Sequence, residues 1–179
     1  MKSAFFAFFL SVSALAQNPY LHPAACGPAN IGFKVKLDES QHDHLQPEPG
    51  MARVYFIHDT GDWGVIGYPT MKIGMDGAWL GANHGSSYFS ASLAAGEHHV
   101  CARLQSSLVQ DRTELLHFQA EAGKVYFFRT RLIMSRQVEL LELEPLDSDQ
   151  GLYLTATYPL SISQPKQQEE PREHAPNSR

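Results

Sequence analysis

Histidine is the residue type with the clearest chemical potential in this 179-residue chain, because it occurs in two close pairs. His42 and His44 flank Asp43, and His98 is followed directly by His99. In an extended chain His42 and His44 point to the same side, so that two imidazoles and a carboxylate could hold zinc or copper. Adjacent strand residues point to opposite faces, so His98 and His99 cannot serve one site. Metal sites usually need three or four converging ligands, and exposed loop histidines are the simpler interpretation.

The nucleophiles and acids form no catalytic motif. Asp59 and Asp62 could act as a glycosidase-like carboxylate pair or a cation loop, but the glycines of DTGDWG explain them more simply as turn residues. Four serines lie close together without a G-x-S-x-G elbow: Ser86, Ser87, Ser90 and Ser92. The sequence therefore favours a protein that is not an enzyme and needs no cofactor, with an unrecognised Asp/His hydrolase as the alternative.

Cys26 and Cys101 are the only two cysteines. The N-terminus, described next, predicts export, and disulfides persist in the oxidising environment outside the cytoplasm. We therefore expect a disulfide between the two cysteines. Cys26 could instead carry a lipid anchor, but the preceding Pro23-Ala24-Ala25 lacks the leucine usual three residues before such a cysteine. Two unpaired buried thiols remain a further alternative.

The N-terminus predicts export. Lys2 gives a positive start, residues 4–12 are apolar, and Ala14-Leu15-Ala16 fits a small-x-small cleavage pattern. We expect a signal peptide over residues 1–16 and a periplasmic or extracellular mature chain from Gln17. The alternative is a buried N-terminal helix.

Composition narrows the possible partners. The formal net charge of −5 argues against nucleic-acid binding, which needs clustered Lys and Arg. After the first residues no stretch is long and apolar enough for a transmembrane span. An envelope polymer or protein remains the expected partner, of unknown identity.

The elements that would position these residues centre on Asp76-Gly77, a strong signal for a two-residue type I′ hairpin. Its register predicts that Met75 faces Ala78, and Ile73 faces Leu80. One face is then apolar, and the other carries Lys72, Gly74, Trp79 and Gly81.

Further strands are predicted on both sides of this hairpin. A second hairpin is expected from Ser86 to Gln105, turning at residues 95–97. Other strands are expected at residues 31–37, 51–58, 114–120, 125–133 and 137–144, whereas residues 147–157 could begin as a capped helical turn.

This spacing predicts an all-β fold, an antiparallel β-sandwich of about seven or eight strands. The expected order is a signal peptide (1–16), an N-terminal arm with the first strand (17–50), the core domain (51–160) and a disordered tail (161–179). The tail has too few apolar residues to order itself.

Trp79 and Lys72 are the predicted ligand-binding residues. Both lie off the apolar face, and an amphipathic ring beside a cation suits stacking on a sugar or an anionic polymer. Burial of Trp79 under the second sheet or the 59–69 loop is the competing interpretation.

The runs ARVYFIHDTG, MKIGMDGAWLG, GSSYFSASLAAGEHHVCA and AGKVYFFR resemble the domain of unknown function 2846 family. The matching motifs fall at 52–55, 76–81, 85–98 and 122–127, and the "DG…lG" portion is also similar to PEGA and transthyretin-like surface modules. The resemblance implies an exported bacterial β-sandwich and assigns no activity. A non-enzymatic envelope protein that acts by binding or as an accessory is the function that the sequence favours. A metal-binding protein built on His42 and His44 is a further alternative.

Overall fold

The computed structural model describes residues 23–40, 43, 46–60, 69–105, 112–134 and 139–167. The predicted signal peptide, the predicted metal ligands His42 and His44, and Asp62 lie outside these residues.

The described chain is mostly β. It forms ten strands and one helix: β1 (Ile31–Asp38), β2 (Met51–His58), β3 (Thr70–Met75), β4 (Ala78–His84), β5 (Ser87–Ala94), β6 (Gly96–Gln105), β7 (Thr113–Ala120), β8 (Val125–Met134), β9 (Glu139–Leu146), α1 (Ser148–Thr157) and β10 (Leu160–Gln167). The number of strands exceeds the predicted seven or eight. None of the helical structure in the described ranges is both long and apolar enough to cross a membrane.

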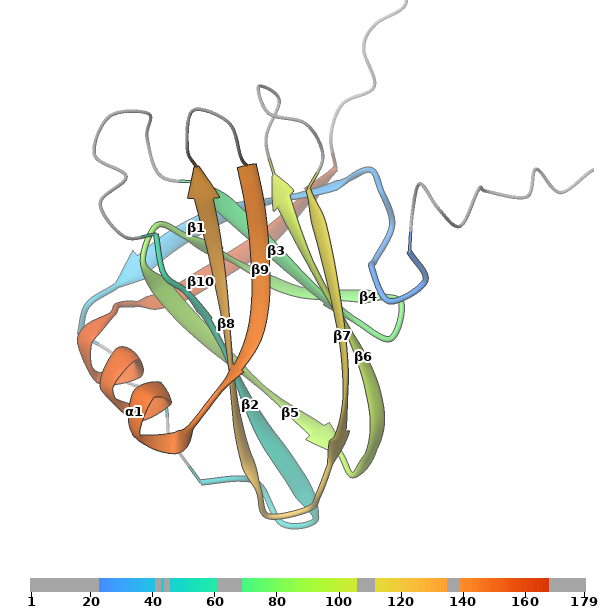
Figure 1. Cartoon of the computed structure of the whole chain (residues 1–179), viewed down its shortest axis with the longest axis vertical. Helices are drawn as coiled ribbons and strands as arrows, with labels where there is room; N and C mark the ends of the chain where they lie inside the picture. The colour runs from blue at the N-terminus through green and yellow to red at the C-terminus, as the bar shows by residue number, and fades with distance from the viewer. Residues whose placement is uncertain are drawn as a thin grey trace, which may run out of the picture.

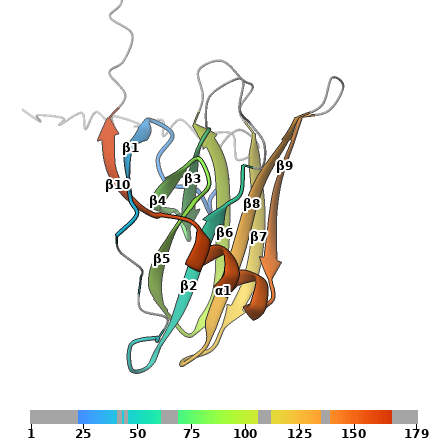
Figure 2. The ribbon, with the colours of Figure 1, turned by 90° about the vertical axis from the view of Figure 1, so that its left-hand side faces the viewer.

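The strands form two sheets (Figures 1 and 2). Sheet A has the order β1-β10-β5-β2-β8-β9, and sheet B has the order β4-β3-β6-β7. Most neighbours are antiparallel, but β2 pairs parallel to β8, and β10 pairs parallel to β5. The predicted antiparallel arrangement therefore holds for most strand pairs but not for these two. Short turns predict antiparallel neighbours, whereas these parallel pairs join strands that are distant in sequence.

The hairpin at Asp76-Gly77 is confirmed. Both turn residues have positive φ, 52° and 88°, as a type I′ turn requires. Met75 faces Ala78 as predicted, but a register shift between Ile73 and Gly74 then places Ile73 opposite Gly81. Leu80, expected on the apolar face, is consequently 39% exposed.

The second predicted hairpin is wrong. β5 pairs with β2 in sheet A, whereas β6 pairs with β3 and β7 in sheet B. The residues between β5 and β6 therefore carry the chain from one sheet to the other (Figure 1). Both arrangements have the same strand–turn–strand pattern, and only long-range pairing distinguishes them.

The predicted disordered tail starts too early. β10 pairs with β1 over eight positions, from Ile31–Gln167 to Asp38–Leu160. Backbone hydrogen bonds order this segment although its side chains are mostly polar. Residues 168–179 lie outside the described chain.

Helix α1 confirms the expected cap at residue 147. The Asp147 carboxylate accepts a hydrogen bond from the Gln150 N–H, which satisfies one of the free amides of the first turn. Gly151 has low intrinsic helix propensity but permits the packing of the helix, because a Cβ there would overlap the Phe127 ring. The helix lies on the outer face of sheet A (Figure 2), over a small aromatic cluster of Tyr55, Tyr88 and Phe127.

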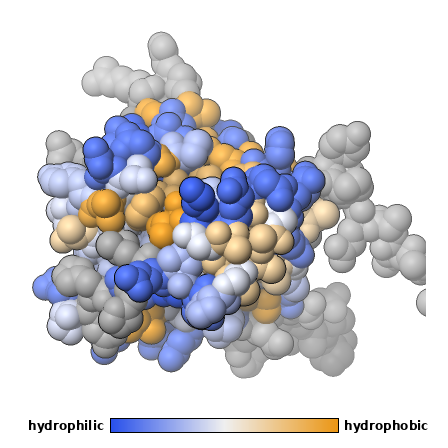
Figure 3. Space-filling view, turned by 90° about the horizontal axis from the view of Figure 1, so that it is seen from below, coloured by the Kyte–Doolittle hydropathy of each residue, from blue (hydrophilic) through white to orange (hydrophobic). Residues whose placement is uncertain are grey.

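The main core lies between the sheets and draws on both. Its buried members are Ala52, Val54, Phe56, Met71, Ile73, Met75, Phe89, Leu93, Val100, Ala102, Leu104, Ala120, Phe128, Leu132 and Leu141. Seen from below, the surface of the molecule has apolar side chains interspersed with hydrophilic ones (Figure 3).

We expect Gly77→Val to destabilise the protein by roughly 1–3 kcal/mol, because a branched side chain is strained at positive φ. A Cβ there would also lie 3.3 Å from the Ala24 carbonyl oxygen. Gly77→Asn is the matched control, since asparagine tolerates this conformation better. Equilibrium urea unfolding measures both, and equal stability of parent and Gly77→Val would contradict the prediction.

Candidate functional site

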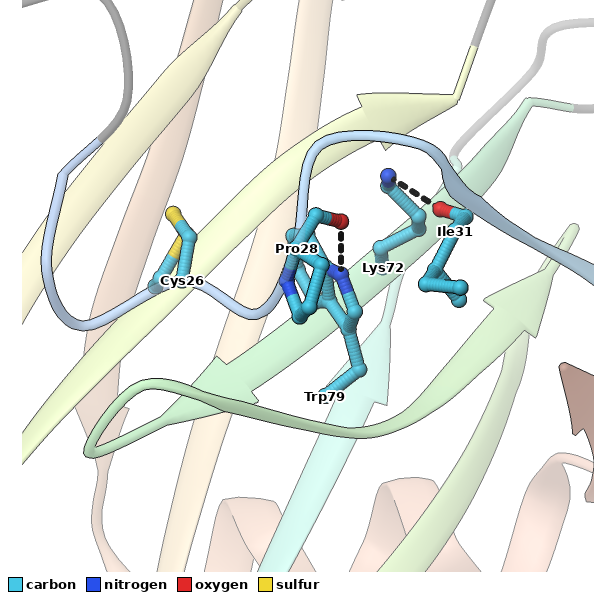
Figure 4. Close-up of a disulfide and its surroundings, with 6 residues drawn as sticks. Cys26, Pro28, Ile31, Lys72 and Trp79 are labelled. Atoms are coloured by element: carbon cyan, nitrogen blue, oxygen red, sulfur yellow. Dashed lines mark hydrogen bonds between the residues drawn. A yellow bond between two sulfur atoms is a disulfide. The ribbon is translucent and has the colours of Figure 1, made fainter. Parts of the chain in front are cut away.

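The segment before β1 lies across the outer face of sheet B (Figure 4). We call residues 23–30 the covering segment. A tight turn opens it, in which Cys26 N–H donates to the Pro23 carbonyl at 3.0 Å. Gly77 N–H of the β3–β4 turn donates to the Ala25 carbonyl at 3.2 Å. The covering segment is therefore hydrogen-bonded to the hairpin as well as continuous with β1.

The predicted disulfide between Cys26 and Cys101 is present, with the two Cα atoms 5.2 Å apart. In the strand register Cys101 lies between Gly74 of β3 and Leu115 of β7. It points away from the core, as its phase in the sequence predicts, and the covering segment buries it. Both cysteines are buried. The bridge thus ties the covering segment to the middle of sheet B.

Trp79 and Lys72, the predicted ligand-binding residues, are close together under the covering segment (Figure 4). The Trp79 indole N–H donates to the Pro28 carbonyl at 2.8 Å, and a Cβ on Gly27 would overlap the indole. The Lys72 Nζ donates to the Ile31 carbonyl at 2.8 Å and lies 4.2 Å from the Trp79 ring centroid.

These contacts give both side chains a structural role. Lys72 is buried, so its charge depends on the carbonyl and on the ring face for stabilisation. Trp79 is partly buried, and the surface that covers it is the covering segment. Binding of an external ligand by these two residues stays a prediction.

An open hollow of about 540 Å³ lies beside the covering segment. It is lined by Pro23, Ala24, Ala25, Asp76, His99, Val100, Leu115 and Leu116. Most of these side chains are apolar, and Leu115 is 54% exposed. Small-molecule sites are typically hollows of about 300–1,000 Å³ with apolar walls and a few polar groups. The size and lining of this hollow meet that description.

The polar end of the hollow is built around Asp76. One carboxylate oxygen accepts from the His99 backbone N–H at 2.8 Å, and the other lies 2.6 Å from His98 Nδ1. Partial burial raises the pKa of Asp76, but these bonds outweigh it, and the net pKa is lowered. Burial likewise lowers the pKa of His98, and the bond to Asp76 reverses this to a net rise. The short contact thus favours the carboxylate form of Asp76 and the imidazolium form of His98.

His99 faces His117 of β7 directly across the strand pair. Both side chains are exposed, and their ring centroids are 6.1 Å apart. Sequence reasoning correctly separated His98 from His99 but missed His117, because the partner depends on the β6–β7 register. Across the ranges that the structure describes, no cluster of three or more metal-ligating side chains is found.

The other candidate groups have structural partners. Asp59 accepts from the Tyr158 hydroxyl at 3.0 Å, and Arg129 lies 3.8 Å from its second oxygen. The four serines bond elsewhere: Ser86 with Thr60, Ser87 with Ser161, Ser90 with Asp43, and Ser92 with Arg53 and Glu48. None of these bonds joins a serine hydroxyl to an imidazole nitrogen.

His58 is the one fully buried imidazole in the described chain. Its Nδ1 lies 3.1 Å from the Thr130 carbonyl oxygen and 3.0 Å from Thr130 Oγ1, whereas its Nε2 has no hydrogen-bond partner among the residues that the structure describes. Burial lowers the pKa of His58 to about 4, despite the bond to Thr130. The ring is therefore neutral at physiological pH and is enclosed in the protein.

Replacing both cysteines by serine should destabilise the protein. The bridge spans a sequence separation of 75 residues, for which the chain-entropy model gives roughly 4–5 kcal/mol. We also expect the Trp79 emission to shift to longer wavelength as the covering segment loosens, read in a Trp63→Phe background. Chemical denaturation measures the first effect, and an unchanged midpoint would refute it.

His58 should make stability fall with acidification. Its pKa drops from 6.5 in the unfolded chain to about 4 in the fold, so stability is fully present above pH 6.5 and is lost between pH 6.5 and 4. The loss amounts to about 3 kcal/mol at most, at about 1.4 kcal/mol per pH unit. His58→Gln should remove this part of the pH dependence in urea unfolding. If the unfolding free energies of the parent and of His58→Gln changed equally with pH, the prediction would be wrong.

Comparison with known proteins places the chain in a family. Neither the curated proteins nor the solved structures include a significant match to it. The family described as "Protein of unknown function (DUF2846)" matches residues 48–142, which is more than half of the chain. This range runs from just before β2 into β9 and contains Trp79, Lys72, Cys101 and the polar end of the hollow. The chain therefore belongs to the DUF2846 family.

Proposed function

We propose that this protein is an exported, non-enzymatic β-sandwich of the bacterial envelope that acts by binding a partner through the hollow on sheet B. The observation that carries the proposal is the hollow itself, about 540 Å³ with mostly apolar walls and the Asp76 carboxylate at one end. Export is supported by the signal-like N-terminus and by the bridge between Cys26 and Cys101.

The hollow is suited to binding because its walls are held in place. The covering segment forms one wall and is fixed by the bridge and by the hydrogen bond to Gly77. Leu115 forms the opposite side from a strand paired to β6 at eight consecutive positions. A preformed apolar surface loses little conformational entropy when a ligand binds.

The polar end of the hollow favours ligands that carry a hydrogen-bond donor or a positive charge. Asp76 is ionised, and Glu97 adds a second carboxylate near His99, with 3.7 Å between its Oε1 and His99 Nε2. We therefore favour an apolar ligand, or an apolar side chain of a partner, that carries a hydrogen-bond donor or a cation at one end.

Binding of the apolar dye N-phenylnaphthylamine tests this function. We expect fluorescence enhancement with the parent and about tenfold weaker binding with Leu115→Glu, because an unpaired charge would line an apolar wall. Leu140→Glu is the matched control, since Leu140 is a similarly exposed leucine on β9, outside the hollow. Equal dye binding by parent and Leu115→Glu, with both folded, would refute the proposal.

A further inference from the structure

His99 and His117 form a cross-strand imidazole pair at the edge of the hollow. They are direct partners in the β6–β7 register, so both side chains project from the outer face of sheet B. Both are exposed, with ring planes inclined by 31° and centroids 6.1 Å apart. The register of two paired strands thus places two nitrogen ligands together on a rigid surface.

The spacing can be compared with that of a shared metal ion. An imidazole nitrogen binds zinc or copper at about 2.0–2.1 Å, so the centroids of two rings on one ion are separated by roughly 4.5–6.4 Å for angles at the metal between about 90° and 180°. The separation of 6.1 Å between His99 and His117 lies inside this range. Both rings are exposed, and exposed side chains change rotamers readily, so the two imidazoles are free to reorient toward one ion.

The surrounding charge favours a cation. Glu97 projects from the same face as His99, and its Oε1 is 3.7 Å from His99 Nε2. Asp76 lines the same hollow as His99. A carboxylate beside an imidazole attracts a cation and can hydrogen-bond to water on a bound metal.

The imidazole of His98, next to His99 in the sequence, is not available as a ligand. His98 Nδ1 is 2.6 Å from Asp76, and its Nε2 is 2.9 Å from the Ala94 carbonyl oxygen, so both ring nitrogens are occupied. The two adjacent histidines of β6 therefore have different roles. His98 stabilises the β3–β4 turn, whereas His99 is available at the surface.

We propose that His99 and His117 together bind one divalent late transition-metal ion, with water completing its coordination. Copper(II) should bind most tightly, because first-row divalent ions follow the Irving–Williams order at imidazole sites. The site goes beyond the apolar binding proposed above and does not depend on it, since the imidazoles lie on the exposed rim.

Titration calorimetry of the metal-free full chain with copper(II) chloride, and separately with zinc chloride, tests this site. The chain holds nine histidines, so the informative quantity is the difference between variants. We expect His99→Gln and His117→Gln each to weaken the same binding event by about tenfold or more, because one imidazole is left. His84→Gln is the control and should leave it unchanged, because His84 lies on β4 with its ring bonded to Thr70. Acidification should weaken binding in the parent, because the ligating imidazole must be neutral.

Copper(II) is paramagnetic, so it also locates the site by nuclear magnetic resonance. We expect selective broadening of backbone signals at residues 97–101 and 115–119, lost in His117→Gln. Unchanged affinity in both single variants, or broadening confined to other residues, would overturn the proposal whether or not the dye binds the hollow. Conversely, loss of dye binding in Leu115→Glu with the copper event intact would separate the two sites.

Discussion

The bridge between Cys26 and Cys101 is the constraint on which the surface of sheet B depends. It fixes a proline- and alanine-rich segment that has no apolar periodicity of its own to hold it on the sheet. With the segment in place, Trp79 and Lys72 gain carbonyl partners, and Lys72 can be buried as a cation. The same segment forms one wall of the hollow. The disulfide therefore keeps the covering segment over Trp79 and Lys72, and it also fixes one wall of the open hollow.

The local features of the fold were predictable from sequence, and the pairing of distant strands was not. The Asp76-Gly77 turn has a specific backbone requirement, so its residues predict it directly. The segment from β5 to β6 has equally regular alternation, but its two strands lie in different sheets. β10 was missed for the related reason that its order comes from hydrogen bonds to β1, whose residues lie at least 122 positions away in the sequence.

The large sequence separation explains why β10 was missed: its pairs with β1 are 122 positions apart at Asp38–Leu160 and 136 apart at Ile31–Gln167. A local sequence pattern does not report pairing over such a separation.

The prediction of the candidate site was limited in the same way, because it could use only local patterns. Trp79 and Lys72 were found because they fall out of phase with the core residues of a single hairpin. The partner of His99 was missed because it comes from another strand, and the two positions become neighbours only through the β6–β7 register. The alternation along one strand shows on which face of the sheet a side chain lies, whereas the pairing between strands determines which side chains are its neighbours.

The two outer faces of the fold differ in how completely they are covered, and this difference determines where binding can occur. On sheet A, Gly151 allows α1 to press directly on Phe127, and the aromatic cluster beneath the helix is buried. On sheet B the cover is the covering segment, which lies over Cys101 and Trp79 and leaves a hollow beside it. The part toward β7 therefore keeps Leu115 and the His99–His117 pair at the surface. This is the physical reason for placing both the hollow and the metal-binding pair on the same side of the molecule.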